Sequence, residues 1–286
     1  MEGRQLSLSN LDKVMYPEVG FTKGELIDYY TRVAPAVLPH LRGRPLTLKR
    51  YPNGVDGQHF YEKNCPSHRP PWVATREIGG IDYCLCDDLP TLVWAANLAD
   101  LELHPSLALA DAIEQPTVMA FDLDPGEPAG VLECRQVALW LRDTLGRIGL
   151  QCYPKTSGSK GLQVYAPLNT AGVTYDHTKP LSQALARHLE GEHPELVVSS
   201  QKKELRRGKV LIDWSQNDEH KTTVCVYSLR ARARPTVSTP LTWEELEAAG
   251  GTDELAFTAD EVLERLDEHG DLFAPVLELE QGLPRL

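Results

Sequence analysis

Two aspartates one residue apart follow an apolar run in the segment TVMAFDLDPG, residues 117–126. Residues i and i+2 of a β-strand point to the same face, so Asp122 and Asp124 are expected to lie side by side. Carboxylates held that close repel each other unless a cation lies between them, and Mg²⁺ and Mn²⁺ prefer carboxylate oxygens. The pattern indicates a divalent metal site. The alternative is an Asp-rich turn, because Asp-Pro-Gly is common turn chemistry.

A third acid of the same kind is Asp213, which ends the apolar strand in GKVLIDWSQN, residues 208–217. Three strand-end acids are what a two-metal phosphoryl-transfer site requires, in which ions roughly 3.5–4 Å apart stabilise the attacking and leaving oxygens. The sequence therefore suggests that Asp122, Asp124 and Asp213 hold two Mn²⁺ or Mg²⁺ ions.

The turn SGSKG, residues 157–161, offers complementary groups for a phosphate. Its backbone N–H groups, the Ser157 hydroxyl and the Lys160 ammonium group suit an anion, although the Walker A spacing is absent. An ordinary hairpin turn is the alternative. Gln216 and Arg230 follow other predicted strands, and an arginine suits a triphosphate because its donors are bidentate.

The elements that must position these residues alternate between strands and helices. Residues 22–38 are predicted to form a helix, in which Thr22 and Glu25 make a capping box. The strands from residue 151 onward come in hairpin-like groups, so the sequence predicts a two-lobed α+β body rather than a doubly wound sheet. Further helices are expected at 91–103, 133–149, 180–190 and after Thr242 and Thr258, and strands at 44–50, 117–124, 149–157, 161–168, 208–217 and 222–231.

The bulk composition is that of an ordinary globular protein, with 42% hydrophobic and 24% charged residues in 286. No apolar run reaches the roughly 18 residues of a membrane helix, and the polar N-terminus is not that of a signal peptide. The formal charge of −12 is concentrated in residues 241–286, where 13 acids and two arginines give −11. The remaining residues, with 28 acids and 27 lysines or arginines, are nearly neutral, so local basic clusters matter more than the total charge. Two such clusters, at 202–209 and 230–234, could bind an anionic partner, and a solvated face or strand end is the alternative for each.

Six cysteines show no evident pairing framework, which favours a cytosolic protein with reduced thiols. Cys65, His68, Cys84 and Cys86 could in principle bind zinc, but their spacing is irregular.

With these features together, the chain resembles the polymerase domain of bacterial DNA ligase D, a branch of the archaeo-eukaryotic primase superfamily. The resemblance covers nearly the whole chain, 1–286, as a single domain that includes the acidic helical segment 241–286. It implies a two-lobed primase-polymerase fold whose catalytic half is an RRM-like, mostly antiparallel sheet flanked by helices. It is carried by the motifs LDKVMYPEVGFTKGELIDYY, HFYEKNCPSHRP, LVWAANLADLELHP, FDLDPGE, TSGSKGLQVYAPL, GKVLIDWSQN and YSLRARARPTVSTPLTWEEL.

The resemblance also implies roles for individual residues. Asp122, Asp124 and Asp213 would be the catalytic metal ligands, and Lys13 and Lys23 would bind the 5′-phosphate of a gapped or broken DNA end. Phe60 and Tyr61 would stack on the template strand, although hydrophobic core is the alternative for such a pair. The incoming nucleotide would be contacted by His104, Ser157, Lys160, Gln163, Gln216 and Arg230.

Gln163 departs from the family pattern, which usually has histidine there. Glutamine donates only a neutral hydrogen bond, so the resemblance implies a less charged nucleotide pocket.

The predicted activity is template-directed nucleotidyl transfer onto gapped or broken DNA in the bacterial cytosol, during nonhomologous end joining. Nucleoside triphosphates would be substrates, and the Ku end-binding protein and a DNA ligase would be partners. The alternatives are a stand-alone primase-polymerase, a catalytically weak DNA-end-binding module and an unrelated metal-dependent phosphoesterase.

Overall fold

The computed structural model describes residues 3–284, and the chain divides into two compact units. None of the helices within 3–284 combines the length and the hydropathy needed to cross a membrane. The first unit extends to Ser106 and includes Thr222–Ser238 and Thr258–Asp271, whereas the second contains Leu107–Lys221, Thr239–Phe257 and the chain from Leu272 onward.

The second unit is built on a five-stranded sheet with the strand order β11-β12-β8-β10-β9. All its strand pairs are antiparallel except β11 with β12, so the expected mostly antiparallel sheet is confirmed. The strands are β8 (Val118–Pro125), β9 (Tyr153–Thr156), β10 (Leu162–Pro167), β11 (Val197–Val198) and β12 (Val210–Asp213).

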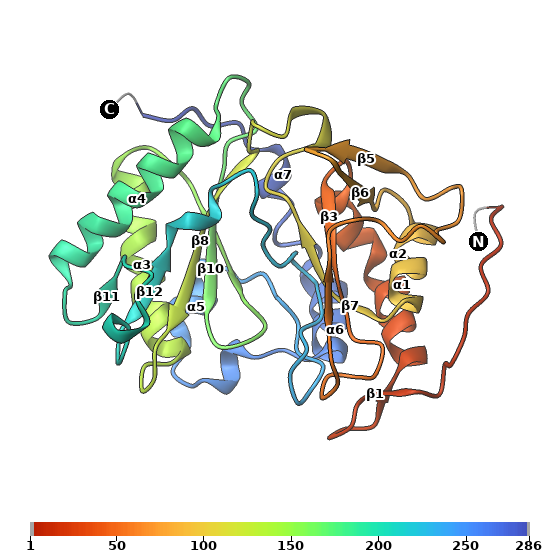
Figure 1. Ribbon diagram of the computed structural model, residues 1–286. Coiled ribbons are helices and arrows are strands. Elements are labelled where there is room, and N and C mark those ends of the chain that lie inside the picture. The colour runs from red at the N-terminus through yellow and green to blue at the C-terminus, as the bar shows by residue number, and fades with distance from the viewer. Residues whose placement is uncertain (1–2, 285–286) are drawn as a thin grey trace. The chain divides into compact units, whose positions relative to one another are not determined.

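The side chains of β8 show that one face of this sheet is apolar and that the other carries polar residues. Met119, Phe121 and Leu123 are fully buried in the core, while Asp122 and Asp124 occupy the alternate positions on the other face. The apolar face is covered by α3 (Val131–Arg147) and α4 (Tyr175–Glu192), which lie beside the sheet in Figure 1. The unit also contains η1 (Ala110–Ala112), η2 (Lys203–Leu205), η3 (Trp214–Gln216), α5 (Trp243–Ala248), η4 (Asp253–Leu255) and α7 (Pro275–Glu278).

The first unit contains a second five-stranded sheet, in which β3 pairs with β4, β6 and β7, and β5 pairs with β6. The buried face of α1 packs against α2, and a short β1-β2 hairpin precedes α1. The elements are β1 (Val14–Tyr16), β2 (Phe21–Thr22), α1 (Lys23–Leu41), β3 (Pro45–Arg50), β4 (Phe60–Glu62), β5 (Thr75–Ile78), β6 (Ile81–Leu85), α2 (Leu89–Asn97), β7 (Asp100–Pro105) and α6 (Ala259–His269).

The capping box predicted at Thr22 and the helix starts predicted at Thr242 and Thr258 are confirmed. The Thr22 hydroxyl accepts from the Glu25 N–H and the Glu25 carboxylate accepts from the Thr22 N–H, and Thr242 and Thr258 make the same box at α5 and α6. These short-range signals place the starts of three helices.

Two predicted elements are wrong. The expected helix 91–103 ends at Asn97, and β7 begins three residues later because Ala99, at a φ of 60°, reverses the chain. An apolar run alone does not distinguish a buried helix from a buried strand. Residues 222–231 form no regular strand, since Tyr227 has a φ of 64° and pairing is limited to isolated bridges.

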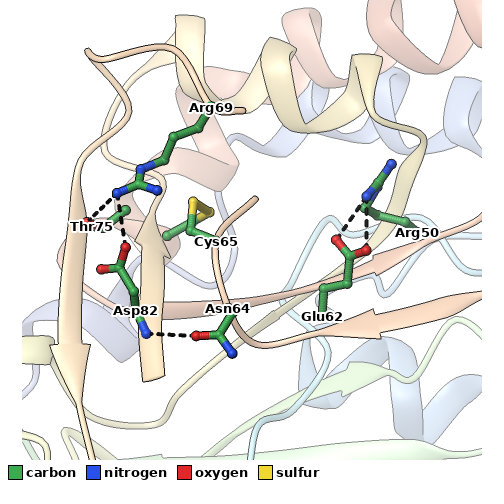
Figure 2. Close-up of a disulfide and its surroundings, with 8 residues drawn as sticks. Arg50, Glu62, Asn64, Cys65, Arg69, Thr75 and Asp82 are labelled. Atoms are coloured by element: carbon green, nitrogen blue, oxygen red, sulfur yellow. Dashed lines mark hydrogen bonds and ion pairs between the residues drawn. A yellow bond between two sulfur atoms is a disulfide. The ribbon is translucent and has the colours of Figure 1, made fainter. Parts of the chain in front are cut away.

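The prediction of reduced thiols throughout is also wrong, because Cys65 and Cys84 form a disulfide (Figure 2). The N–H of Cys65 donates to the carbonyl of Asp82 at 2.6 Å, which holds this segment against β6. The two Cα atoms then lie 5.0 Å apart, within disulfide range. The zinc hypothesis fails with it, since two of its four ligands are consumed. The other four cysteines of the described chain are buried and belong to no disulfide.

The disulfide is expected to stabilise the protein by closing a loop across 19 residues. The double substitution Cys65→Ser and Cys84→Ser should lower the free energy of unfolding by about 2–4 kcal/mol. Urea unfolding with and without dithiothreitol measures this. The reductant should weaken the wild type and leave the double variant unchanged; a wild type that is insensitive to dithiothreitol would show that the bond contributes nothing.

Candidate active site

The polar face of the second unit's sheet brings together residues from three neighbouring strands. The register pairs Asp122 of β8 with Asp213 of β12 on one side and with Gln163 of β10 on the other. Residues directly opposite each other have Cβ atoms about 4.5–5.5 Å apart and share a face. Asp124 lies on the same face of β8 two residues further on. The register therefore places Asp213 beside Asp122, and the strand period places Asp124 on the same face.

Each carboxylate is also engaged by a different donor. The Gln163 Nε2 donates to Asp122 Oδ1 at 3.1 Å, and Arg206 Nη1 lies 3.6 Å from Asp124 Oδ2. Asp213 is the most heavily bonded of the three acids. Its two oxygens accept from Ser215 N–H at 2.9 Å, Ser215 Oγ at 2.6 Å, Gln216 Nε2 at 2.9 Å and Gln201 Nε2 at 2.8 Å.

The negative charges of Asp122, Asp124 and Asp213 suit a hard divalent cation. Burial, together with the charges of Asp213 and Asp124, raises the pKa of Asp122 to about 6. A divalent cation would offset this repulsion, and carboxylate oxygens are its preferred donors. Within the part of the chain that the structure describes, these carboxylates are not gathered closely enough to form a metal site as they stand. Each is turned toward a different donor, so binding an ion would require them to turn toward one another.

The SGSKG turn closes the hairpin between β9 and β10 and is seated against the end of β8. Ser157 Oγ accepts from the N–H groups of Ser159 and Gly161 at 3.2 and 3.1 Å. A Cβ on Gly161 would lie 2.0 Å from the Leu123 carbonyl oxygen, so only glycine permits this approach. Lys160 is exposed, with its Nζ 3.2 Å from Glu127 Oε1. The turn thus places Ser157 and Lys160 at the same end of the sheet as Asp124.

In the first unit, His104 and Arg230 gather around a carboxylate that the sequence reading missed. Glu102, with 3% of its side chain exposed, accepts from Lys49 Nζ at 3.0 Å and from His104 Nε2 at 3.0 Å. Arg230 Nε lies 3.4 Å away, and the Ala231 N–H donates to the other oxygen at 3.0 Å. Burial alone raises the pKa of Glu102, but the His104 hydrogen bond and the charges of Arg230 and Lys49 outweigh it and hold this pKa well below its usual range.

The two residues predicted to stack on a template are exposed, which rules out the hydrophobic-core alternative. Phe60 is 42% and Tyr61 is 49% exposed. The Tyr61 ring packs edge-on against His104, with centroids 5.7 Å apart, and its hydroxyl lies 2.6 Å from Thr222 Oγ1. These contacts orient Tyr61 beside the Glu102 cluster.

The two predicted phosphate-binding lysines lie at the start of the first unit. Lys13 is exposed and donates to Asn53 Oδ1 at 3.0 Å, whereas Lys23 is buried and donates to the carbonyl of Ser9 at 2.7 Å. Burial, and then the positive charge of Lys13, lower the pKa of Lys23. An anion bound by both ammonium groups would offset that repulsion.

Sequence reasoning missed Glu102, Lys155 and Gln201, and it included Arg206 only as part of the basic cluster at 202–209. Glu102 and His104 stand at i and i+2 in ELHP, a spacing that places both on one face of a strand and could have indicated their pairing. Gln201 and Arg206 reach the acids, and Lys155 reaches Gln163, only through strand register and loop packing, for which the sequence gives no local signal.

Known proteins resemble this chain in sequence and in fold. The family described as LigD, primase-polymerase domain, matches residues 22–273. The multifunctional non-homologous end joining protein LigD of Mycolicibacterium smegmatis is 42% identical over 278 residues, covering 95% of this chain and 36% of that protein. The bifunctional LigD of Bacillus subtilis is 33% identical over 266 residues, covering 93% of this chain and 43% of that protein. The chain thus spans less than half the length of these relatives.

A solved structure also has the fold of this chain. The polymerase domain from Mycobacterium tuberculosis ligase D, in complex with DNA, superposes with a TM-score of 0.89 and 39% identity, covering 97% of this chain and 99% of that one. Fold and comparisons together define a DNA-directed nucleotidyltransferase of the primase-polymerase class. More specifically, the chain belongs to the LigD primase-polymerase domain family, whose members are metal-dependent nucleotidyltransferases. The expected family and α+β fold are therefore confirmed.

Proposed function

We propose that this chain adds nucleotides to gapped or broken DNA during nonhomologous end joining, with its two units acting as one polymerase domain. The observation that carries the proposal is the strand register that sets Asp213 opposite Asp122, with Asp124 on the same face. The relatives named as end-joining proteins, and the similar domain in complex with DNA, support the repair setting. Ku and a DNA ligase are the proposed partners, and the bacterial cytosol is the proposed location.

In the proposed reaction, the primer 3′-hydroxyl oxygen bonds to the α-phosphorus of a nucleoside triphosphate. The bond from that phosphorus to the bridging oxygen breaks, pyrophosphate leaves, and the hydroxyl proton passes to solvent. Asp122, Asp124 and Asp213 would hold two Mg²⁺ or Mn²⁺ ions. When bound, such ions supply charge stabilisation for the attacking and leaving oxygens.

The chain's other predicted site residues have roles that follow from their chemistry. Ser157 and Lys160 would bind phosphate oxygens at the turn, and Gln216, already bonded to Asp213, would add an amide donor. Arg230 and His104, held by Glu102, would contact the nucleotide, and the exposed rings of Phe60 and Tyr61 would stack on template bases.

Primer extension tests this function. The substrates are gapped DNA with and without a downstream 5′-phosphate, each with ribo- or deoxyribonucleotides and with Mg²⁺ or Mn²⁺. Templated addition that is faster on the 5′-phosphorylated gap supports the proposal. Addition that ignores the phosphate would favour a stand-alone primase-polymerase, and DNA binding without addition under any condition would favour an end-binding module.

Lys13→Ala and Lys23→Ala are expected to weaken binding to gapped DNA that carries the 5′-phosphate. Each loses one charge-assisted hydrogen bond, which costs about 1.5–3 kcal/mol, or roughly 10- to 150-fold in Kd. Binding to the same DNA without the phosphate should change little, as fluorescence anisotropy at fixed salt would show.

Arg32→Ala is the matched control, because Arg32 is an exposed cation on the helix that begins with Lys23. It should affect both DNAs slightly and equally. An equal loss on both DNAs for the lysine variants as well would mean that they act only through general electrostatics.

A further inference from the structure

A fully buried lysine stands two strands away from Asp122. Lys155 of β9 is 0% exposed, and the register places it opposite Gln163, which in turn lies opposite Asp122. The three residues therefore form one row across β9, β10 and β8, on the same face of the sheet. None of the chemistry proposed above uses Lys155.

The row is joined by two hydrogen bonds. Lys155 Nζ donates to Gln163 Oε1 at 2.5 Å, and Gln163 Nε2 donates to Asp122 Oδ1 at 3.1 Å. The Lys155 ammonium group also lies 5.4 Å from the centre of the Tyr165 ring, in a cation–π contact that helps to fix its position.

The lysine determines which way the amide points. An ammonium group only donates hydrogen bonds, so the atom of Gln163 that faces it must be the carbonyl oxygen. The amide nitrogen then faces Asp122, whose ionised carboxylate only accepts. The reversed amide would set donor against donor and acceptor against acceptor, so the buried charge of Lys155 selects the arrangement that holds Asp122.

We propose that Lys155 and Gln163 are positioning residues that hold the Asp122 carboxylate for a divalent cation. This role rests on the proposed function of Asp122 and differs from the nucleotide contact that the family pattern implies for Gln163. Gln163 is 4% exposed, and both polar atoms of its amide are engaged within the row. Residues that orient a metal ligand in this way usually change metal affinity when they are replaced.

The test measures the Mn²⁺ affinity of the protein in the absence of nucleotide and DNA. Electron paramagnetic resonance quantifies the Mn²⁺ that remains unbound. Lys155→Met and Gln163→Leu should each weaken Mn²⁺ affinity by about 10- to 100-fold. The double variant should be little worse than either single variant, because both act through the same carboxylate. Gln163→His should retain most of the affinity, since a neutral imidazole has one acceptor for Lys155 and one donor for Asp122.

Lys179→Met is the matched control, because it removes a lysine of the same unit that pairs with Asp218, not with the row. It should leave Mn²⁺ affinity unchanged. In steady-state extension, Lys155→Met should recover activity as Mn²⁺ is raised, with an unchanged KM for the nucleotide. A residue needed only for folding would not be rescued by metal.

Two results would overturn the proposal: unchanged Mn²⁺ affinity in folded Lys155→Met, or a higher nucleotide KM with unchanged Mn²⁺ affinity in Gln163→Leu. Thermal melting establishes that each variant is folded; should Lys155→Met fail to fold, Gln163→Leu and Gln163→His carry the test. Gap filling by the wild type tests the polymerase function separately. A wild type that binds Mn²⁺ through this row but adds no nucleotide would refute that function and leave the positioning role standing.

Discussion

Replacing Asp122, Asp124 or Asp213 by alanine is expected to abolish nucleotide addition while leaving the binding of gapped DNA largely intact. Each substitution removes one of the three carboxylates on the polar face of the second unit's sheet. Metal ions at such sites supply several kcal/mol of transition-state stabilisation, so the rate should fall by a factor on the order of 10³ or more. Single-turnover extension of a gapped primer measures the rate, and fluorescence anisotropy measures DNA binding.

The fold should survive these changes. Burial and the neighbouring acids disfavour the ionised form of Asp122, as its raised pKa indicates, so removing that carboxylate relieves an unfavourable charge. The melting temperature of Asp122→Ala should therefore not fall substantially. Asp143→Ala serves as the matched control, because Asp143 is an exposed aspartate of α3 paired with Arg142. Any of the three variants that extends primers at the wild-type rate would show that its residue is not a ligand.

The placement of Asp122 and Asp124 on one face could be predicted from the sequence because the signal that places them is local. The apolar run of β8 ends in the alternating residues Phe121, Asp122, Leu123 and Asp124, and the strand period of two assigns both aspartates to one face. The capping box at Thr22 and the helix starts at Thr242 and Thr258 are signalled equally locally, and the structure confirms them. Each of these features depends on residues no more than a few positions apart.

The partners of the acids could not be predicted because they depend on strand register. Gln163 meets Asp122 across 41 residues of sequence, and Lys155 joins them only because β9 pairs with β10 at one particular offset. A shift of one residue in either pairing would turn the side chains to the other face. The disulfide also depends on packing that the local sequence does not show. Cys65 lies next to Cys84 because its segment is hydrogen-bonded to β6 at Asp82.

Glu102 is another residue whose importance comes from register. Strand β7 pairs with β3 so that Lys49 lies directly opposite Glu102, and Arg230 reaches the same carboxylate from a segment 128 positions later in the numbering. The sequence identified His104 and Arg230 by family pattern but gave no sign that one buried acid holds both. Their orientation in the first unit therefore depends on a residue that has no predicted contact with substrate.

Replacing Glu102 by alanine is expected to destabilise the protein by about 3–5 kcal/mol, because it leaves partly buried cations without their shared counter-charge. Lys49 and Arg230 would lose their ion pairs, and His104 would lose its acceptor. Urea unfolding at pH 7 measures the stability. Because His104 and Arg230 are predicted nucleotide contacts, the KM for the nucleotide should rise in the same variant at temperatures where it remains folded.

The pH dependence of the stability lost in Glu102→Ala follows from the direction in which the pKa of Glu102 is shifted. The pKa of Glu102 is held well below its ordinary value of 4.5, so the carboxylate's contribution to stability is fully present above pH 4.5. It is lost as the pH falls toward the folded-state pKa. The stability difference between the wild type and Glu102→Ala should therefore be constant at neutral pH and narrow in acid below pH 4.5.

Glu62→Ala is the matched control, since Glu62 pairs with Arg50 in the same sheet but is 31% exposed. An ion pair with a partly exposed carboxylate contributes less than a buried one, so this control should lose less stability than Glu102→Ala. Equal losses in the two variants would mean that the contacts of Glu102 contribute no more to stability than the single pair between Glu62 and Arg50. A Glu102→Ala protein of normal stability and raised nucleotide KM would instead show that Glu102 serves to orient His104 and Arg230 without supporting the fold.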